Sequence, residues 1–334
     1  MRPQLLFVLG LISATCLPAQ QTSLSGPVEA LTFDPPTRSL RAVNGFPGAA
    51  SFGPALLSNV DLATVAPGQN YGILFERGKC LFVSGLGTKV VSTVIPSVTS
   101  YPDRIVWSAN GSLVILYSRA GHWFQTIAGF PTAPVANTLV DVASLGGSLT
   151  TMAVDAAGKQ IVLAVSGDNG GVFESAGGQF TPLVSMAKPV SLSFSSDGET
   201  LYALDAATAR VTAVTLGSHG LQTLALSGIT NPVAIQSLVD SENRQVLYVA
   251  GGTDRLVRIL DVATQQTISE VQLSFQPTCL DPFGSGSFVL ASRSQSANPL
   301  WLFAATPQPA AYFVPAVQLR TPDRKSIAVA GRTP

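Results

Sequence analysis

Seven hairpin-like units recur along the chain, and this repeat constrains the fold more than any other feature. Each unit contains a short apolar strand, a tight turn rich in Gly, Pro, Asn or Asp, and a second apolar strand. The turns are marked by Pro36, Gly68, Gly111, Gly158, Gly198, Asn243 and Gly284. These markers return about every 40 residues, a period typical of the strand-built blades of β-propellers.

The residue types in the units favour strands over helices. Asn110-Gly111 and Asp197-Gly198 are tight-hairpin dipeptides, which predict type I′ turns with positive φ at both positions. Val, Ile, Leu, Tyr and Thr fill the flanking runs, and no apolar stripe with a period of 3.6 residues appears beyond the N-terminal segment. A single sheet cannot bury both of its faces, whereas seven sheets packed around a ring can. We therefore predict an all-β, seven-bladed β-propeller with four-stranded antiparallel blades.

The ring must also be closed. Residues 326–330 (SIAVA) have the pattern of a strand and lie beyond the seventh unit. The first unit is the shortest, because its marker Pro36 lies only 32 residues before Gly68. We expect the C-terminal strand to complete blade one.

Two stretches, SSDGETLYALDAATARVTAVTL and NRQVLYVAGGTDRLVRILDVATQQTISEVQL, resemble the repeats of bacterial YVTN-type β-propellers. The matching residues are Ser195, Asp197, Gly198, Leu201 and Tyr202 in the fifth unit, and Leu247, Tyr248, Val249, Val257, Ile259, Asp261 and Thr264 in the sixth. The other units match only in their turn and strand pattern. The Trp-Asp dipeptide of WD40 propellers does not occur, and Gly-His occurs once, at Gly121-His122. The resemblance implies a fold and no particular chemistry.

The first 19 residues have the pattern of a secretory signal peptide. Arg2 supplies a short positive region, residues 5–14 form an apolar stretch, and residues 17–19 (LPA) form a small-residue exit. The apolar stretch is too short to span a membrane, and a buried N-terminal helix is the alternative. We expect cleavage near Ala19 or Gln20, export to the periplasm or the extracellular space, and a single propeller domain over residues 20–334.

The composition limits the partners. The formal net charge is zero and charged residues make up only 11% of the chain, against the usual quarter. Such a surface argues against nucleic acid or an anionic membrane as partner. Cys80 and Cys279 remain after signal cleavage, both in apolar runs, which predicts buried free thiols. An exported protein can form a disulfide, but these two cysteines fall in units that are not neighbours.

Three carboxylates occupy equivalent positions in the first three units. Aligned on their turns, Glu29, Asp61 and Asp103 stand where each innermost strand begins. On consecutive inner strands they would form an acidic arc at one mouth of the central channel, able to bind a cation or a basic group. The alternative is that they are solvated residues just outside the strands.

The loops expected at the same face carry mixed charge, which suits a polar ligand or a protein. The candidate binding residues there are Arg77, Arg119, His122, Asp168, Asp205, Asp254, Arg255 and Arg293. Ordinary loop polarity is the alternative interpretation.

No motif indicates catalysis. His122 and His219 are the only histidines and fall on different faces of the predicted ring, which argues against a shared metal site or joint acid–base work. We expect no cofactor and no metal. The sequence favours a monomeric, non-catalytic protein that binds a protein, a polysaccharide or a small polar ligand. The alternative is a hydrolase or lactonase-like enzyme that uses the acidic arc.

Overall fold

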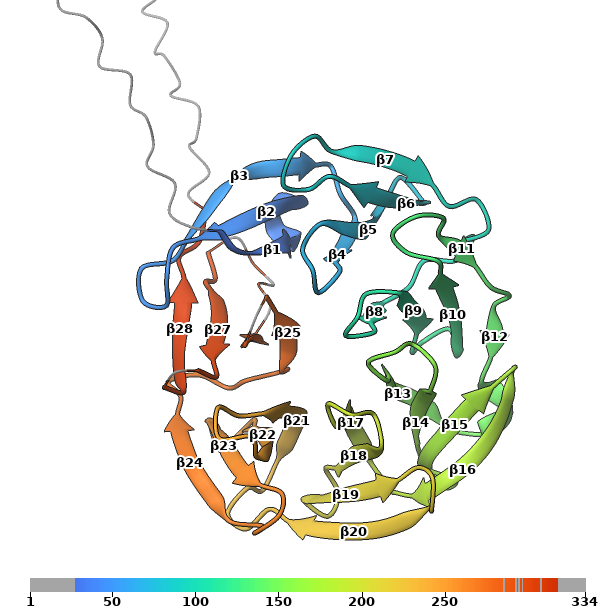
Figure 1. Ribbon diagram of the computed structural model, residues 1–334, viewed down its shortest axis with the longest axis vertical. Coiled ribbons are helices and arrows are strands. Elements are labelled where there is room, and N and C mark those ends of the chain that lie inside the picture. Colours follow the sequence, from blue (N-terminus) through green and yellow to red (C-terminus); the bar gives the residue numbers. More distant parts are fainter. Residues whose placement is uncertain are drawn as a thin grey trace, which may run out of the picture.

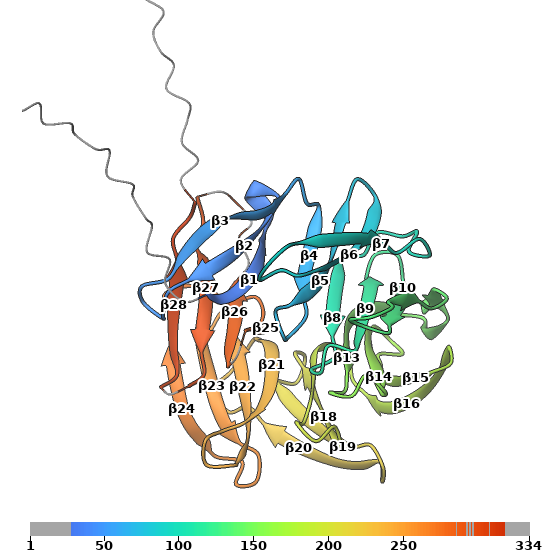
Figure 2. The same cartoon turned by 45° about the horizontal axis from the view of Figure 1, so that its top comes forward.

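The computed structural model describes residues 28–284, 286–291, 293, 295, 297–306 and 308–317. These residues form seven antiparallel sheets arranged around a ring, which confirms the prediction of an all-β, seven-bladed propeller. Figure 1 views the ring along its axis, and Figure 2 shows it tilted. The helices of the described part are two 3₁₀ turns, η1 (Pro35–Thr37) and η2 (Ala143–Leu145). Neither is long and apolar enough to cross a membrane.

The blades follow one another in chain order, and each sheet runs from the ring axis outward (Figure 1). Blades one to three contain β1 (Val28–Asp34), β2 (Ser39–Asn44) and β3 (Ser51–Ser58); β4 (Leu62–Val65), β5 (Tyr71–Glu76), β6 (Lys79–Ser84) and β7 (Val91–Val94); and β8 (Arg104–Trp107), β9 (Leu113–Ser118), β10 (Trp123–Ala128), β11 (Val135–Ala136) and β12 (Val140–Asp141). Blades four and five contain β13 (Ser148–Val154), β14 (Ile161–Ser166), β15 (Gly171–Ala176) and β16 (Gln179–Ser185); and β17 (Pro189–Phe194), β18 (Thr200–Asp205), β19 (Arg210–Thr215) and β20 (Gly220–Ala225). Blades six and seven contain β21 (Pro232–Val239), β22 (Gln245–Gly251), β23 (Leu256–Asp261) and β24 (Thr267–Gln272); and β25 (Asp281–Phe283), β26 (Ser287–Ala291), β27 (Leu300–Ala304) and β28 (Ala310–Val314). In blade three the outermost position is shared by β11 and β12, which both pair with β10.

The hydrophobic core consists of seven clusters, one between each pair of neighbouring blades. The second strand of a blade contributes to the clusters on both of its sides. In β5, for example, the consecutive residues Ile73, Leu74 and Phe75 are only 0%, 3% and 2% exposed. Since successive strand side chains point to opposite faces, three buried residues in a row mean that both faces are covered. The unbroken apolar runs in the sequence therefore mark second strands.

The hairpins of the repeat lie where the sequence predicts them, but their turn type differs. Gly111 and Gly198 have φ of 74° and 77°, whereas Asn110 and Asp197 are not among the residues with positive φ. The type I′ prediction is therefore wrong. The Gly111 N–H closes the turn on the Ser108 carbonyl at 2.9 Å, and only the glycine needs the left-handed conformation.

Blade one departs from the sequence prediction. Glu29, at one end of β1, contacts Ser287, where β26 begins, and Asp34, at the other end, contacts Arg293, just after β26. β1 therefore runs in the same direction as β26, the second strand of blade seven. The three strands of blade one correspond to the second, third and fourth strands of the other blades. Placing Glu29 at the start of an innermost strand was wrong.

This assignment explains the short first interval of the repeat. Pro36 lies in a hairpin between a second and a third strand, whereas Gly68 lies between a first and a second strand. The predicted closing strand, residues 326–330, lies outside the described residues, as does the predicted signal peptide, residues 1–19.

A buried ion pair joins blade seven to blade one. Arg293 Nη1 lies 2.7 Å from Asp34 Oδ1, and the side chains are 1% and 0% exposed. Arg293 also donates from Nε to the Asn298 carbonyl at 2.7 Å, and its guanidinium lies 5.2 Å from the centre of the Phe52 ring. Thr37 Oγ1 donates to the second oxygen of Asp34 at 2.5 Å. Both charges are therefore hydrogen-bonded as well as paired.

We predict that Arg293→Met destabilises the propeller by about 3–5 kcal/mol, because it removes the close partner of the buried Asp34 carboxylate and leaves only Arg41, whose Nε lies 3.7 Å from Oδ2. Urea denaturation followed by tryptophan fluorescence measures this. The matched control is Arg244→Met, which breaks a pair with Asp240 on the surface of blade six and should shift the midpoint much less. Equal shifts in the two variants would contradict the prediction.

Candidate functional site

The predicted site residues are best located by the two ends of the ring. We call the rim face the end that carries the hairpins between second and third strands and the connections into the innermost strands. Its hairpins are residues 35–38, 77–78, 119–122, 167–170, 206–209 and 252–255, together with the loop around Arg293. All predicted site residues except Glu29 belong to this end.

In blades two and three, an aspartate just before the innermost strand holds the rim hairpin of its own blade. Asp61 Oδ2 accepts the backbone N–H of Arg77 at 2.8 Å, and Asp103 Oδ2 accepts that of Arg119 at 3.0 Å. Asp61 also pairs with Arg38 of blade one, and Arg119 Nε lies 3.2 Å from Asp103 Oδ1. These two carboxylates therefore have structural partners within the rim face.

Blades five and six make the same connection in reverse. There the aspartate belongs to the rim hairpin or the strand end beside it, and the backbone N–H groups belong to the entry of the innermost strand. Asp205, at the rim end of β18, accepts the backbone N–H of Lys188, which precedes β17, at 3.1 Å. Asp254, in the hairpin after β22, accepts the backbone N–H groups of Thr230 and Asn231 at 2.9 and 3.2 Å. We call each of these four contacts an entry latch, because it ties the entry of an innermost strand to the hairpin beside it.

The pKa of Asp254 reflects its latch. Burial raises this pKa, but the hydrogen bonds from the Thr230 hydroxyl and from the Asn231 and Thr230 backbone amides, with the charge of Arg258, lower it overall. The ionised carboxylate is therefore the form that the folded protein stabilises.

Asp168 and His122 have different surroundings. Asp168 is exposed in the rim hairpin of blade four. There a Cβ on Gly147 would lie 2.4 Å from the Ser166 carbonyl oxygen, so backbone packs directly on backbone. His122 has φ of 54°, its carbonyl accepts the Val142 N–H at 2.9 Å, and its buried Nδ1 has no hydrogen-bond partner among the described residues. His219 lies between the third and fourth strands of blade five, at the opposite end of the ring.

Two predicted residues lie at the junction of blades one and seven. Arg293 is buried in the ion pair with Asp34. Glu29 lies at the end opposite the rim face, where Oε1 accepts from the Tyr312 hydroxyl and lies 3.4 Å from Ser287 Oγ, while Oε2 has no hydrogen-bond partner among the described residues. The structure therefore brings Asp103 and Arg119 together but separates Glu29 from Asp61 and Asp103, and these three carboxylates do not form one arc.

The sequence analysis missed two charged residues on inner strands. Asp281 is an exposed residue of β25, in blade seven, and Arg104 is an exposed residue of β8, in blade three. Desolvation raises the pKa of Asp281 above its usual value, although a hydrogen bond with Cys279 and the charge of Arg104 act in the opposite direction. The signal in the sequence is a carboxylate inside the apolar run PTCLDPF.

The two cysteines confirm in part the prediction of buried free thiols. Cys80 and Cys279 are free; Cys80 is buried and Cys279 is half-buried. Burial raises the pKa of Cys80 to about 12 and that of Cys279 well above its usual value. Neither thiol is ionised at neutral pH, so neither is an activated nucleophile.

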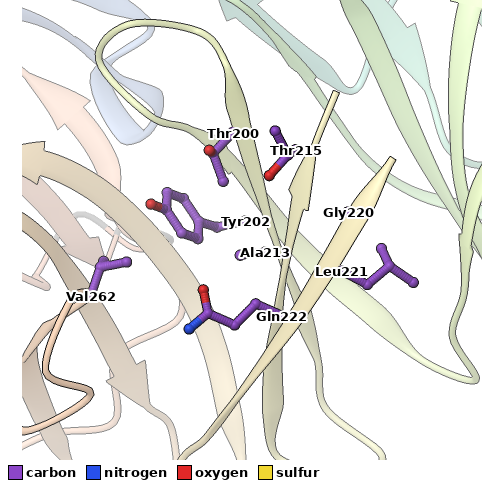
Figure 3. Close-up of a pocket in the computed structure, with 8 residues that line it drawn as sticks. All are labelled: Thr200, Tyr202, Ala213, Thr215, Gly220, Leu221, Gln222 and Val262. Carbon is purple, nitrogen blue, oxygen red and sulfur yellow. The ribbon is translucent and has the colours of Figure 1, made fainter. Parts of the chain in front are cut away.

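Two surface hollows lie away from the rim face. One, of about 290 Å³, lies against blade five and reaches Val262 of blade six (Figure 3). Figure 3 shows the Tyr202 ring and the Gln222 amide at its wall; the full lining is Thr200, Tyr202, Ala213, Thr215, Gly220, Leu221, Gln222 and Val262. The other, of about 270 Å³, lies beside Glu29 and Phe46. Within the described ranges, no three His, Cys, Asp or Glu side chains are grouped so that they could hold a metal ion.

Comparison with known proteins supports the fold but identifies no family for this chain. No protein-family model matches the chain, and no curated protein matches it. A streptogramin B lyase structure is similar with a TM-score of 0.56 and 10% identity, covering 78% of this chain and 84% of that one. A chain of a nidogen/laminin complex aligns with a TM-score of 0.47 and 14% identity, over 72% of this chain and 92% of that one. The first likeness supports the propeller fold.

We predict that Asp254→Ala lowers the free energy of unfolding by about 1–2 kcal/mol at pH 7, because it leaves two backbone N–H groups without their charged acceptor. The pKa of Asp254 is lowered in the folded state, so its contribution is present above the ordinary carboxyl pKa of about 4 and is lost as the pH falls through the folded pKa. Urea denaturation at pH 7 and at pH 3 measures both effects.

The control for this prediction is Asp168→Ala, in the equivalent hairpin of blade four, which should change stability much less. A penalty for Asp254→Ala that is no larger than that of the control at pH 7 would contradict the entry latch.

Proposed function

We propose that this chain is an exported, non-catalytic binding protein that uses its rim face to hold a partner with acidic groups. One observation carries the proposal: four aspartates of the rim face are engaged in entry latches, while three arginines on neighbouring hairpins stay exposed, two of them paired with a latch aspartate. The side chains of Arg77, Arg38 and Arg119 are 83%, 59% and 43% exposed. They stand on blades two, one and three, next to one another around the ring (Figure 1).

Guanidinium groups on hairpins of this kind suit recognition of carboxylates. Arginine presents a planar fork of donors that matches carboxylate geometry. The latches hold the backbone of Arg77 and Arg119 in place before any partner arrives, so less conformational entropy is lost on binding. Arg77 is the most available of the three, since its nearest carboxylate is Glu76 at 3.9 Å.

The alternative, a hydrolase or lactonase-like enzyme, requires Glu29, Asp61 and Asp103 at one mouth of the channel. Glu29 lies at the end of the ring opposite Asp61 and Asp103, so the acidic arc that the enzyme hypothesis needs is not formed. Binding is therefore the better-supported proposal. Export rests on the sequence of residues 1–19, and N-terminal sequencing of protein recovered from the periplasm or medium tests it.

We predict that the double variant Arg77→Glu/Arg119→Glu weakens binding to an acidic polymer by about tenfold or more, since each reversal replaces attraction by repulsion. Biolayer interferometry with poly-L-glutamate and with polygalacturonate measures this, with neutral dextran as reference. Stronger binding to poly-L-glutamate indicates a protein partner, and stronger binding to polygalacturonate indicates a polysaccharide.

The matched control is Lys89→Glu, an exposed cation at the other end of blade two. It should leave binding unchanged. Loss of binding in the control to the same extent, or no binding of either polymer by the wild-type protein, would overturn the proposal.

A further inference from the structure

The hollow of blade five lies on the face of that sheet that is turned toward blade six, at the end of the ring opposite the rim face. Its floor consists of two rows of directly paired residues that cross β18, β19 and β20, namely Tyr202–Ala213–Gln222 and Thr200–Thr215–Gly220. Directly paired residues share a face of a sheet, and so do residues two positions apart on one strand. In Figure 3 the Leu221 side chain accordingly points away from Tyr202 and Gln222.

Blade six shows how this position is normally filled. Its counterpart of Tyr202 is Tyr248, which also follows a buried leucine in the second strand of its blade. The Tyr248 ring packs against Phe288 and Phe303 of blade seven, with 5.7 and 5.9 Å between ring centres. Its direct partner on the third strand is Ile259. Large side chains therefore cover the face around Tyr248.

The corresponding positions around Tyr202 hold smaller side chains. Its direct partner is Ala213, and blade six contributes the paired Leu247 and Leu260 to the same cluster, in place of two phenylalanines. Val262 borders the space from the side of blade six. The hollow of about 290 Å³ thus corresponds to a region that isoleucine and phenylalanine side chains fill in the next blade.

The polar groups of the hollow are neutral and unpaired. They are the hydroxyls of Thr200, Thr215 and Tyr202 and the amide of Gln222, and none of these side chains makes a hydrogen bond within the described part of the chain. Burial, with a smaller effect of the Asp197 carboxylate, raises the pKa of Tyr202 to about 12. The phenol therefore keeps its proton at neutral pH and can donate a hydrogen bond.

These properties select a class of ligand. None of the lining residues, all of which the structure describes, is charged, so an ionic ligand would lose water without gaining an ion pair. An entirely apolar ligand would cover the polar groups without replacing their hydrogen bonds to water. A sugar ring has hydroxyls at its edge and C–H groups on its faces, so it can bond these groups while it rests on Ala213 and Val262. The volume is at the small end of ligand sites, which suits a single ring.

We propose that this hollow binds one neutral sugar ring that carries an acetamido group. The Gln222 amide offers both a donor and an acceptor, so it can pair with the carbonyl and the N–H of an acetamido group together. The acetamido methyl group finds an apolar surface on Ala213 and Val262. This site goes beyond the binding function proposed for the rim face and is independent of it, since it lies at the other end of the ring and uses no arginine.

Saturation-transfer NMR on the full chain, with N-acetylglucosamine as the probe, tests the proposal. We expect a Kd of about 1–10 mM, because a single ring makes few contacts. Glucose, which lacks the acetamido group, should bind about threefold more weakly or worse, and so should the anion glucuronate. The absence of binding at about 50 mM N-acetylglucosamine would overturn the proposal, as would equal affinity for glucose or glucuronate.

Two variants locate the site. Ala213→Ile introduces the residue that blade six has at this position, so it should fill the hollow and weaken binding of N-acetylglucosamine at least about tenfold. Gln222→Ala, on the edge strand β20, should weaken it about threefold or more and affect glucose less. The matched control is Thr223→Ala, the next residue of β20, which is exposed on the opposite face and should leave the affinity unchanged.

The outcomes separate this site from the rim face. The double variant Arg77→Glu/Arg119→Glu should bind N-acetylglucosamine as the wild-type protein does, so failure of one proposal leaves the other standing. Unchanged affinity in Ala213→Ile, in a variant that melts as the wild-type protein does, places the sugar elsewhere and overturns the assignment. If Ala213→Ile fails to fold, Gln222→Ala decides: a loss no larger than that of Thr223→Ala overturns the assignment.

Discussion

A second strand buried on both faces can exist only with a blade on either side of it. Ile73, Leu74 and Phe75 in blade two show the pattern, and full burial of such a side chain is worth about 1.5–3 kcal/mol. Losing a neighbouring blade returns one face of the strand to water. Because each blade depends on the next, stability is shared around the ring, and the place where the two ends of the chain meet needs connections of its own.

The junction between blades one and seven contains such connections. Its apolar cluster is supplemented by the Asp34–Arg293 ion pair and by the contact of Glu29 with Tyr312. A buried ion pair adds little compared with apolar residues of similar volume, but it strongly penalises any arrangement that separates its charges. Here the charges come from residues 259 positions apart in the chain, so the pair selects the closed ring in its correct alignment.

The sequence predicted the number of blades because every unit carries a hairpin with a proline, glycine or asparagine at its turn. It misplaced β1 because a hairpin between second and third strands has the same pattern as one between first and second strands. The hairpins around Pro36 and Gly68 have the same strand–turn–strand pattern in the sequence. Only the contact of Asp34 with Arg293 shows that the first hairpin joins a second strand to a third. The site was harder to predict. Asp61 and Asp103 were identified because they stand just before the innermost strands, but no residue type in the sequence indicates which backbone N–H groups they accept.

Under the proposed function, the entry latches allow a rim rich in carboxylates to recognise acidic partners. A carboxylate that already accepts backbone N–H groups is partly neutralised by those dipoles, so it opposes an incoming anion less than a solvated one does. Arg77 and Arg119 sit on the hairpins that these carboxylates hold, and they remain exposed. The same aspartates thus hold the backbone of the arginines and weaken their own competing charge. In the proposed function it is therefore the position of the guanidinium groups, rather than the net charge of the chain, that selects the partner.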